Sequence, residues 1–504
     1  MSSFMRSVIS VSISLLAGIV FAGAYSPLNV WILVPLALVV LIALQWRSRI
    51  HVGFLTGLAF GFASFFAQHF WLGVVGADAQ WILSAYLALW IALVGAATSF
   101  VSTRTPVPVA ILLIAGLWVT EEALRGRFPF GGYPWARIPF SQADSPFAAW
   151  STLAGVSFIT AVVVTCAATV AYLVREPSII TILVTGVLLI IAVVVPSTIS
   201  NAVDSQDTVS IAVIQGGTPQ IGLGAMDVRR AVLNNHVNET ILLAAKVTAG
   251  DILQPDLVLW PENSSDINPF TDPEAFQAIS SAAQAINAPI LVGAVVDSIE
   301  SPETEVYNMG IMWDPVIGPG DTYIKNAPVP FGEFIPFRSL LTQFISRYDR
   351  VPRDFAHGQQ PGIFTINGAT LGDLICFEVA VDRVVNKIIE EGANIILVQT
   401  NNATYSNTAL PEQQLNIERM RAIEMGRSVV VAATTGISAA IDANGVVVES
   451  LDDGEVGSFV YAAPVLDNRT PGSRIAPWLE LTICALTLGA LIWLIIRVRY
   501  RRQI

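Results

Sequence analysis

Residues 371–380 read Leu-Gly-Asp-Leu-Ile-Cys-Phe-Glu-Val-Ala, and an apolar helical pattern begins at Val381. The stretch is an apolar strand that runs into Cys376 and then into a helix, which indicates an α/β unit. A side chain at such a junction lies at the edge of a sheet, where a substrate can reach it. Most free cysteines on strands are small buried residues, so position alone does not make Cys376 catalytic.

The two ends of the chain have a membrane-like composition, and the middle is ordinarily globular. The 504 residues are 53% hydrophobic and only 13% charged, whereas a soluble protein carries about a quarter charged residues. We predict a seven-span membrane domain over 1–200 and an inserted domain over 205–470, large enough to bury its own core. A final membrane helix with a basic tail follows at 475–504.

A membrane helix needs about twenty apolar residues. By this rule the sequence predicts eight spans, near 8–24, 27–45, 52–75, 81–101, 106–124, 147–174, 178–197 and 475–496. Arginines lie in alternate loops and in the C-terminal tail, and this charge marks the cytoplasmic side: Arg6, Arg47, Arg49, Arg104, Arg175 and 497–502. We therefore expect a cytoplasmic C-terminus and an extracytoplasmic domain at 205–470.

The loop at 125–146 breaks this charge pattern, because three arginines fall on its outer side: Arg125, Arg127 and Arg137. It is rich in Pro, Gly and aromatic residues, so we predict a structured outer loop. The spans hold few ionisable residues, and we expect these at the membrane interface: His69, Glu121 and Glu122. A pump or transporter would bury such groups at mid-membrane, so a transporter with an outer binding domain is disfavoured.

Charge and cysteine usage exclude further classes of protein. A net charge of −12 without a long basic run argues against nucleic acid as a partner. Cys166 and Cys484 fall inside predicted spans, which leaves Cys376 alone in the inserted domain. It has no disulfide partner there and no metal-ligand spacing around it, so we expect neither a metal nor another cofactor.

The inserted domain alternates apolar strands with amphipathic helices. We predict strands at 209–213, 257–260, 290–296, 307–313, 370–375, 395–399, 428–433 and 458–462, and a hairpin around 444–445. Helices are predicted at 228–247, 273–287, 381–391 and 411–425. This alternation indicates an α/β domain whose sheet is covered on both faces. Such folds place their sites at the carboxyl ends of strands.

Three predicted strand ends carry reactive side chains: Glu262, Lys325 after a further strand end at 321–324, and Cys376. A cysteine attacks as a thiolate, so it needs a base or a cation nearby. Glu262 has the chemistry to take the thiol proton, and Lys325 to favour the thiolate and stabilise an oxyanion. Taken singly, a carboxylate at a helix N-terminus and a surface cation are the commoner roles for these two residue types.

The residues around these three positions resemble the nitrilase superfamily. The motifs are Trp260-Pro261-Glu262, Lys325 with Pro328-Val329-Pro330-Phe331-Gly332-Glu333, Cys376-Phe377-Glu378, Thr400-Asn401-Asn402 and Arg421-Ala422-Ile423-Glu424. A nitrilase-like domain between seven spans and an eighth is similar to the apolipoprotein N-acyltransferase family, as is the loop at 128–135. The resemblance implies a multi-pass α-helical membrane domain plus a nitrilase-like αββα sandwich.

The resemblance implies a catalytic triad of Glu262, Lys325 and Cys376. It further implies supporting or substrate-contacting roles for Glu333, Glu378, Phe377, Asn308 and Phe334. The sequence departs from the family pattern in two places. Phe377 stands where a tyrosine is usual, and no tryptophan lies between Gln220 and Val228.

The implied reaction moves a fatty acyl chain from a membrane phospholipid to a thioester on Cys376. The chain then passes to the α-amino group of the N-terminal S-diacylglyceryl cysteine of an apolipoprotein. The resemblance places the protein in a bacterial cell membrane, as a monomer without a cofactor. We interpret 331–345, which is dense in Phe, Leu and Ile, as a mobile arm that rests on the bilayer and covers the site. The alternative is a core segment.

Two other enzyme classes stay open at this point. One is a membrane-tethered nitrilase-type amidase or hydrolase that passes its acyl group to water. A Cys–His hydrolase would need His236, expected on an exposed helix face, or His357, in a polar loop. Gly222-Leu223-Gly224 lacks the Lys-Ser/Thr of a phosphate-binding loop, so we interpret it as a flexible turn.

Overall fold

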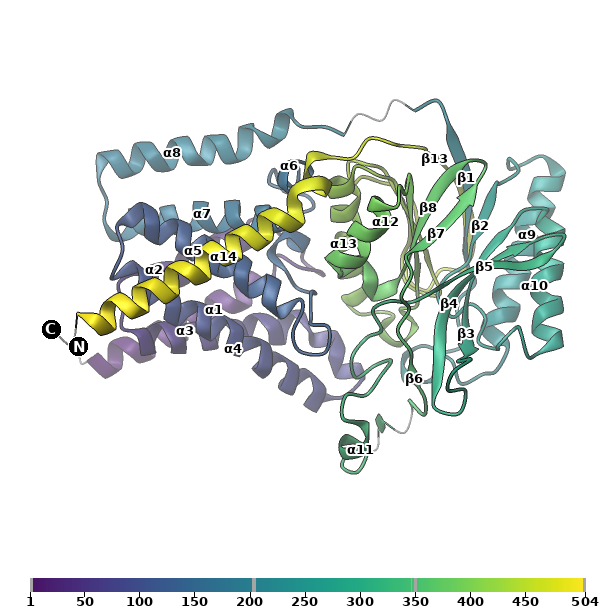
Figure 1. Cartoon of the computed structure of the whole chain (residues 1–504), viewed down its shortest axis with the longest axis horizontal. Coiled ribbons are helices and arrows are strands. Elements are labelled where there is room, and N and C mark those ends of the chain that lie inside the picture. Colours follow the sequence, from purple (N-terminus) through teal and green to yellow (C-terminus); the bar gives the residue numbers. More distant parts are fainter. Residues whose placement is uncertain (1–2, 202–204, 346, 349–350, 502–504) are drawn as a thin grey trace. The chain divides into compact units, whose positions relative to one another are not determined.

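A computed structural model describes residues 3–201, 205–345, 347–348 and 351–501 of the chain. The chain forms two units (Figure 1). One joins Met1–Ser200 to Thr470–Ile504, and the other is Asn201–Arg469.

The first unit consists of apolar helices: α1 (Ser3–Ala22), α2 (Leu33–Gln45), α3 (Ile50–Gln68), α4 (Ala77–Ser102), α5 (Val107–Arg125), α6 (Trp150–Ala154), α7 (Val156–Arg175), α8 (Ile179–Val194) and α14 (Pro471–Tyr500). Among the described residues, seven helices are long and apolar enough to cross a membrane. The span expected at 27–45 is wrong in length, because α2 has only 13 residues. The span expected at 147–174 is divided into α6 and α7 at Gly155, where φ is +81°.

Glycines allow α3 and α4 to approach each other closely. A Cβ on Gly53 would lie 2.3 Å from the carbonyl oxygen of Gly95, and a Cβ on Gly57 2.4 Å from that of Ile91. In lipid, the hydrophobic effect contributes little to the association of helices. Small residues at a helix crossing instead allow the backbones to come close, and van der Waals packing then stabilises the pair.

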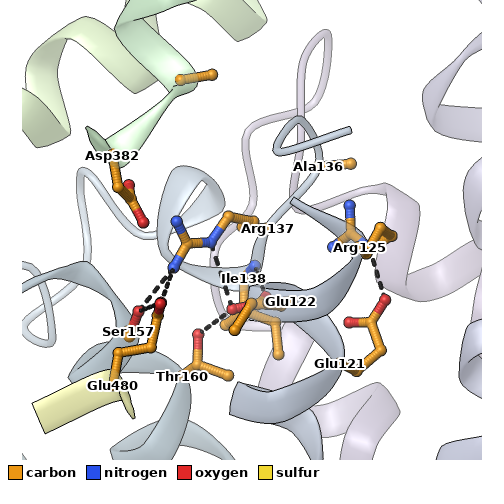
Figure 2. Close-up of polar contacts among 12 residues, drawn as sticks. Glu121, Glu122, Arg125, Ala136, Arg137, Ile138, Ser157, Thr160, Asp382 and Glu480 are labelled. Atoms are coloured by element: carbon orange, nitrogen blue, oxygen red, sulfur yellow. Dashed lines mark hydrogen bonds and ion pairs between the residues drawn. The ribbon is translucent and has the colours of Figure 1, made fainter. Parts of the chain in front are cut away.

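A network of buried charges links α5, α7 and α14 in this unit (Figure 2). The Arg137 guanidinium lies 3.7 Å from Glu122 and 3.6 Å from Glu480, and it donates a hydrogen bond to Ser157 Oγ at 2.8 Å. Ser157 in turn donates to Glu480 at 2.5 Å. Ser157 and Glu480 are 323 residues apart in sequence, so this network joins the last helix of the unit to its earlier helices.

His69, Glu121 and Glu122, which the sequence places toward the ends of predicted spans, are all buried inside the helical unit. Arg125 donates to Glu121 at 2.6 Å, and Arg127 pairs with Glu480 at 2.5 Å. Buried charges are tolerated when they are paired in this way. The loop arginines that break the charge pattern of the sequence are therefore compensated by carboxylates.

The second unit is an αββα sandwich (Figure 1). Its first sheet has the order β13 (Gly457–Pro464), β1 (Thr208–Gln215), β2 (Leu257–Leu259), β3 (Ile290–Asp297), β4 (Glu305–Asp314) and β5 (Gly318–Ile324), with β6 (Asp354–Phe355) beside β4. The second sheet has the order β12 (Val447–Leu451), β11 (Ser438–Ile441), β10 (Val429–Ala433), β9 (Ile395–Thr400), β8 (Ala369–Ile375) and β7 (Gly362–Ile366).

The two sheets pack face to face through a buried apolar core that includes Ile211, Leu259, Leu371 and Leu397. Helices α9 (Ala231–Ala249) and α10 (Pro273–Ile286) cover the outer face of the first sheet. Helices α12 (Asp382–Glu390) and α13 (Leu410–Met425) cover that of the second. Each sheet is thus buried on both faces, which explains its continuous apolar strands.

Strand direction brings several strand ends to one edge of the sandwich. β1, β2 and β3 are parallel, and so are β8, β9 and β10. β4 runs antiparallel to β3, and β5 antiparallel to β4, so β5 ends at the same edge as β2. The residues that follow β2, β5 and β8 are therefore candidates for a shared site.

The buried charge network predicts the effect of changing Glu480 in α14. In Glu480→Gln, Arg137 keeps its burial but loses a counter-charge, so we expect the unfolding free energy to fall by about 3 kcal/mol. The matched control is Arg127→Gln. Arg127 pairs with the same carboxylate but its side chain is 51% exposed, so we expect a loss below about 1 kcal/mol. Equal losses in thermal unfolding of the two variants in nanodiscs would contradict the assignment.

Candidate active site

The structure brings Glu262, Lys325 and Cys376 together at this edge. Lys325 Nζ lies 2.9 Å from Glu262 Oε1 and 2.9 Å from Glu333 Oε1. The Cys376 thiol interacts electrostatically with both Glu262 and Lys325. Three strand ends from two sheets therefore converge on one cluster, together with Glu333 from the segment after β5.

Backbone anchors hold Glu262 at the end of β2. Gln399 Nε2 donates to the carbonyl oxygen of Trp260 at 2.6 Å, and the Thr434 hydroxyl donates to that of Glu262 at 3.0 Å. The backbone N–H of Asn401 donates to Glu262 Oε2 at 2.9 Å. Residues after β9 and β10 of the second sheet thus fix a carboxylate that belongs to the first sheet.

Cys376 begins the short 3-10 helix η6 (Cys376–Ala380) directly after β8, with φ of +54°. This left-handed conformation costs a non-glycine residue on the order of 1–2 kcal/mol, and it persists only where the surroundings determine it. The turn ends the strand at once and places the thiol at the edge of the sheet.

Two carboxylates keep Lys325 charged although its side chain is 1% exposed. Burial opposes the charge, but Glu262 and Glu333 outweigh it and hold the pKa of Lys325 well above its usual value. Asn308 completes the cluster, because its Nδ2 donates to Glu262 Oε1 at 2.6 Å and to Glu333 Oε1 at 3.0 Å. Asn308 thereby separates two carboxylates that would otherwise repel each other.

The side chain of Cys376 rests as a thiol. Burial, and then the carboxylate of Glu262, raise the pKa of Cys376 to about 12, although Lys325 and the Thr400 hydroxyl lower it. Since the free thiolate is scarce at neutral pH, attack requires that a base remove the proton as the new bond forms. Glu262 is the carboxylate whose charge acts most strongly on this thiol.

Glu378 acts on the backbone around the cluster. Its Oε1 accepts hydrogen bonds from the N–H groups of Asn326 and Ala327, at 2.6 and 2.9 Å. Its Oε2 accepts from the Tyr323 hydroxyl and from the N–H of Ile375, both at 2.8 Å. Glu378 therefore ties the residues that follow Lys325 to the residue that precedes Cys376.

The two phenylalanines singled out in the sequence follow residues of the cluster in the chain, Phe377 after Cys376 and Phe334 after Glu333. Phe377 is half-buried next to the thiol, and the Phe334 ring packs against that of His357 at 5.4 Å between centroids. Sequence reasoning gave no role to Tyr405, which follows β9. Burial, and then the charge of Cys376, raise the pKa of Tyr405 to about 12. The same strand-end rule that selected Cys376 also applies to this segment.

The structure removes the Cys–His alternative based on His236. This residue was expected on an exposed helix face, but it is fully buried in α9. Its Nδ1 bonds the carbonyl oxygen of Val232 at 2.7 Å, and its Nε2 accepts from the N–H of Gly216 at 3.2 Å. Both ring nitrogens are engaged by backbone, so His236 has a structural role.

Comparison with known proteins identifies the family. Residues 211–466 match the carbon-nitrogen hydrolase family, and residues 17–169 match the apolipoprotein N-acyltransferase N-terminal domain. The chain belongs to the carbon-nitrogen hydrolase family. Together with its apolar helices, the second match makes this member a multi-pass membrane protein.

Several relatives of this chain are named apolipoprotein N-acyltransferase. One from Vibrio parahaemolyticus is 26% identical over 94% of this chain and 94% of its own length. One from Mycolicibacterium smegmatis is 42% identical, over 51% of this chain and 44% of its own length, so this chain spans less than half of that protein. Among solved structures, an amidase mutant from Nesterenkonia sp. AN1 has a TM-score of 0.39 and 16% identity, covering 54% of this chain and 98% of the amidase.

The geometry around Lys325 predicts a coupling between charges. In Lys325→Met, Glu262 and Glu333 are left buried without their cation, so we expect the unfolding free energy to fall by about 3 kcal/mol. Adding Glu333→Gln removes one of the two facing charges and should recover part of this loss, although Glu333→Gln alone destabilises. Thermal unfolding of the four proteins checks the cycle. Strictly additive losses would show that the two charges are not coupled.

Proposed function

We propose that the chain transfers a fatty acyl chain from a membrane phospholipid to the α-amino group of the N-terminal S-diacylglyceryl cysteine of apolipoproteins. The observation that carries the proposal is the cluster of buried Glu262 and Lys325 with half-buried Cys376, in a chain that also provides membrane helices. Both substrates are lipids that leave a bilayer slowly, so an enzyme anchored in the membrane meets them where they are.

The first half-reaction forms a thioester on Cys376. Its sulfur attacks the ester carbonyl carbon while Glu262 takes the thiol proton, and the Lys325 ammonium stabilises the oxyanion. The ester C–O bond then breaks, and Glu262 returns the proton to the leaving alkoxide. The released product is a lysophospholipid.

The second half-reaction consumes the thioester. The α-amino nitrogen attacks the thioester carbonyl, Glu262 accepts the proton that the amine loses, and the C–S bond breaks. The proton returns to the sulfur of Cys376, and the acyl chain leaves as an amide. Glu333 and Asn308 position Lys325 and Glu262 throughout, and Glu378 positions the backbone on either side.

The arrangement in the membrane is part of the proposal. The charge pattern of the loops supports a cytoplasmic C-terminus and an extracytoplasmic catalytic unit over 205–470 in a bacterial cell membrane. A monomer suffices, because the cluster is complete within one chain.

We further propose that 331–345 is the segment that meets lipid. It contains the short helix α11 (Arg338–Leu341), which lies in a loop beyond the two sheets (Figure 1). Its large apolar side chains are exposed to 43–77%: Phe331, Phe337, Leu340 and Phe344. Ile335 is buried and Arg338 pairs with Asp354, so one end of the segment is anchored to the unit. These exposures support an arm over a core segment.

Mass spectrometry of the full-length enzyme incubated with phospholipid tests the proposed reaction. We expect an acyl adduct on Cys376 that is lost in Cys376→Ser and discharged by a diacylated lipopeptide. Discharge by water at the same rate would instead establish the alternative, a membrane-tethered amidase or hydrolase.

Phe337 and Phe344 test the arm. In the double variant with serine at both positions, the apparent affinity for phospholipid in vesicles should fall about tenfold, because two rings no longer enter the lipid. Alkylation of Cys376 by a water-soluble reagent should not change. Val316→Ser, 86% exposed on a hairpin of the same unit, is the matched control. A variant with normal lipid affinity would overturn the arm.

A further inference from the structure

A chain of hydrogen bonds leads from Cys376 to a carboxyl group that the proposed reaction does not use. The Thr400 hydroxyl bonds the Cys376 thiol. Gln414 Nε2 donates to Thr400 Oγ1 at 3.0 Å and to Glu418 Oε1 at 2.9 Å. Glu418 thus ends a relay that starts at the sulfur.

The relay is sealed from solvent. Thr400 and Glu418 are 1% exposed and Gln414 is 2% exposed. Gln414 and Glu418 are four residues apart on α13, so they share the helix face that is turned toward the second sheet. Burying a carboxyl group without a cation is costly, and such a group requires an explanation beyond packing.

The donors and acceptors of the relay favour one direction of the Thr400 hydroxyl. Thr400 Oγ1 and Glu418 Oε1 take both hydrogens of the Gln414 amide, while Asn402 Nδ2 donates to Gln414 Oε1 at 3.0 Å. The Thr400 hydroxyl has two acceptors, the Cys376 sulfur and Gln414 Oε1 at 3.3 Å, and Asn402 competes for the second, which favours donation to the sulfur. A flipped amide would instead present Oε1 to Thr400 and take this hydrogen away.

We propose that Glu418 is a positioning residue for the nucleophile: as a carboxylate it fixes the Gln414 amide so that the Thr400 hydroxyl donates to Cys376. The inference rests on the proposed function, because it assumes that Cys376 is the reacting group. A carboxylate can only accept a hydrogen bond, so it requires the NH₂ side of Gln414. A neutral carboxyl also donates, and it tolerates the flipped amide.

Protonation of Glu418 therefore regulates the site. Burial raises the pKa of Glu418 to about 8, and its bond from Gln414 lowers it only in part. The strands packed against α13, β10 and β11, carry no ionisable side chain. η6 contributes Cys376 and Glu378, and on α13 Arg421 is paired with Glu424 at 2.6 Å and with Asp382 of α12 at 2.6 Å.

The test is the rate of acyl-thioester formation by full-length enzyme in nanodiscs between pH 6.5 and 9.5. We expect the wild-type rate to rise with an apparent pKa of about 8, and this rise to be absent in Glu418→Gln. The rate of the variant at pH 9 should be lower by on the order of fivefold, the worth of one weakened hydrogen bond. Gln414→Leu should also abolish the rise, and the double variant should add nothing further.

Two controls separate positioning from folding. Glu412→Gln removes an exposed carboxylate from the same helix, and it should keep the wild-type profile. Because the folded pKa of Glu418 is raised above its ordinary 4.5, wild type should lose stability relative to Glu418→Gln as the pH rises from 4.5 through 8. A lower rate of thioester formation by Glu418→Gln at pH 9 is then not caused by unfolding, because at this pH the variant is not destabilised by a buried charge.

Alkylation of Cys376 by iodoacetamide, resolved by peptide mass spectrometry, separates this inference from the proposed function. A Glu418-dependent rise in alkylation without any acyl-enzyme would retain the relay and overturn the acyl transfer. An acyl-enzyme that forms with superimposable profiles in wild type and Glu418→Gln would overturn the relay.

Discussion

The ammonium group of Lys325, held out of solvent between Glu262 and Glu333, is the interaction on which the catalytic unit depends. A buried cation is stable only with both carboxylates in place. Each carboxylate in turn needs its own anchors: Asn308 Nδ2 bridges the pair, and the N–H of Asn401 holds Glu262. The strand ends of both sheets must therefore keep their positions relative to one another. Burial, and then the charge of Glu262, keep Cys376 a thiol, although Lys325 favours the thiolate.

The sequence predicts the fold of this unit well, because burial on both faces leaves continuous apolar strands. The strand predicted at 290–296 is β3 (Ile290–Asp297), and the helix predicted at 411–425 is α13 (Leu410–Met425). The strands that were missed are β6 (Asp354–Phe355) and β7 (Gly362–Ile366). One has two residues and the other lies at the edge of its sheet, so neither presents a long apolar run. In the membrane unit the length rule fails at 27–45, where the apolar run exceeds the 13-residue helix that it forms.

Local patterns find residues at strand ends but not the partners of buried charges. Glu262, Lys325 and Cys376 each follow a strand, so a single rule selects all three. Glu122 pairs with Arg137, and Arg137 also pairs with Glu480, which lies more than 300 residues later. A local sequence pattern therefore does not predict that these charges are buried. His236 was misplaced for a similar reason. His236 accepts a hydrogen bond from the N–H of Gly216, 20 residues earlier, and no local sequence pattern predicts this contact.

Two kinds of buried carboxyl group coexist in the catalytic unit, and their environments assign them different tasks. Glu262 faces the Lys325 cation and accepts hydrogen bonds from Asn308 Nδ2 and from the N–H of Asn401, so three partners fix its position. Glu418 receives one amide hydrogen bond, and burial raises its pKa to about 8. A group of this kind changes charge within the physiological range, whereas the thiol, whose pKa is about 12, does not. The pH sensitivity of the site is therefore expected from the carboxyl group that stands behind the nucleophile.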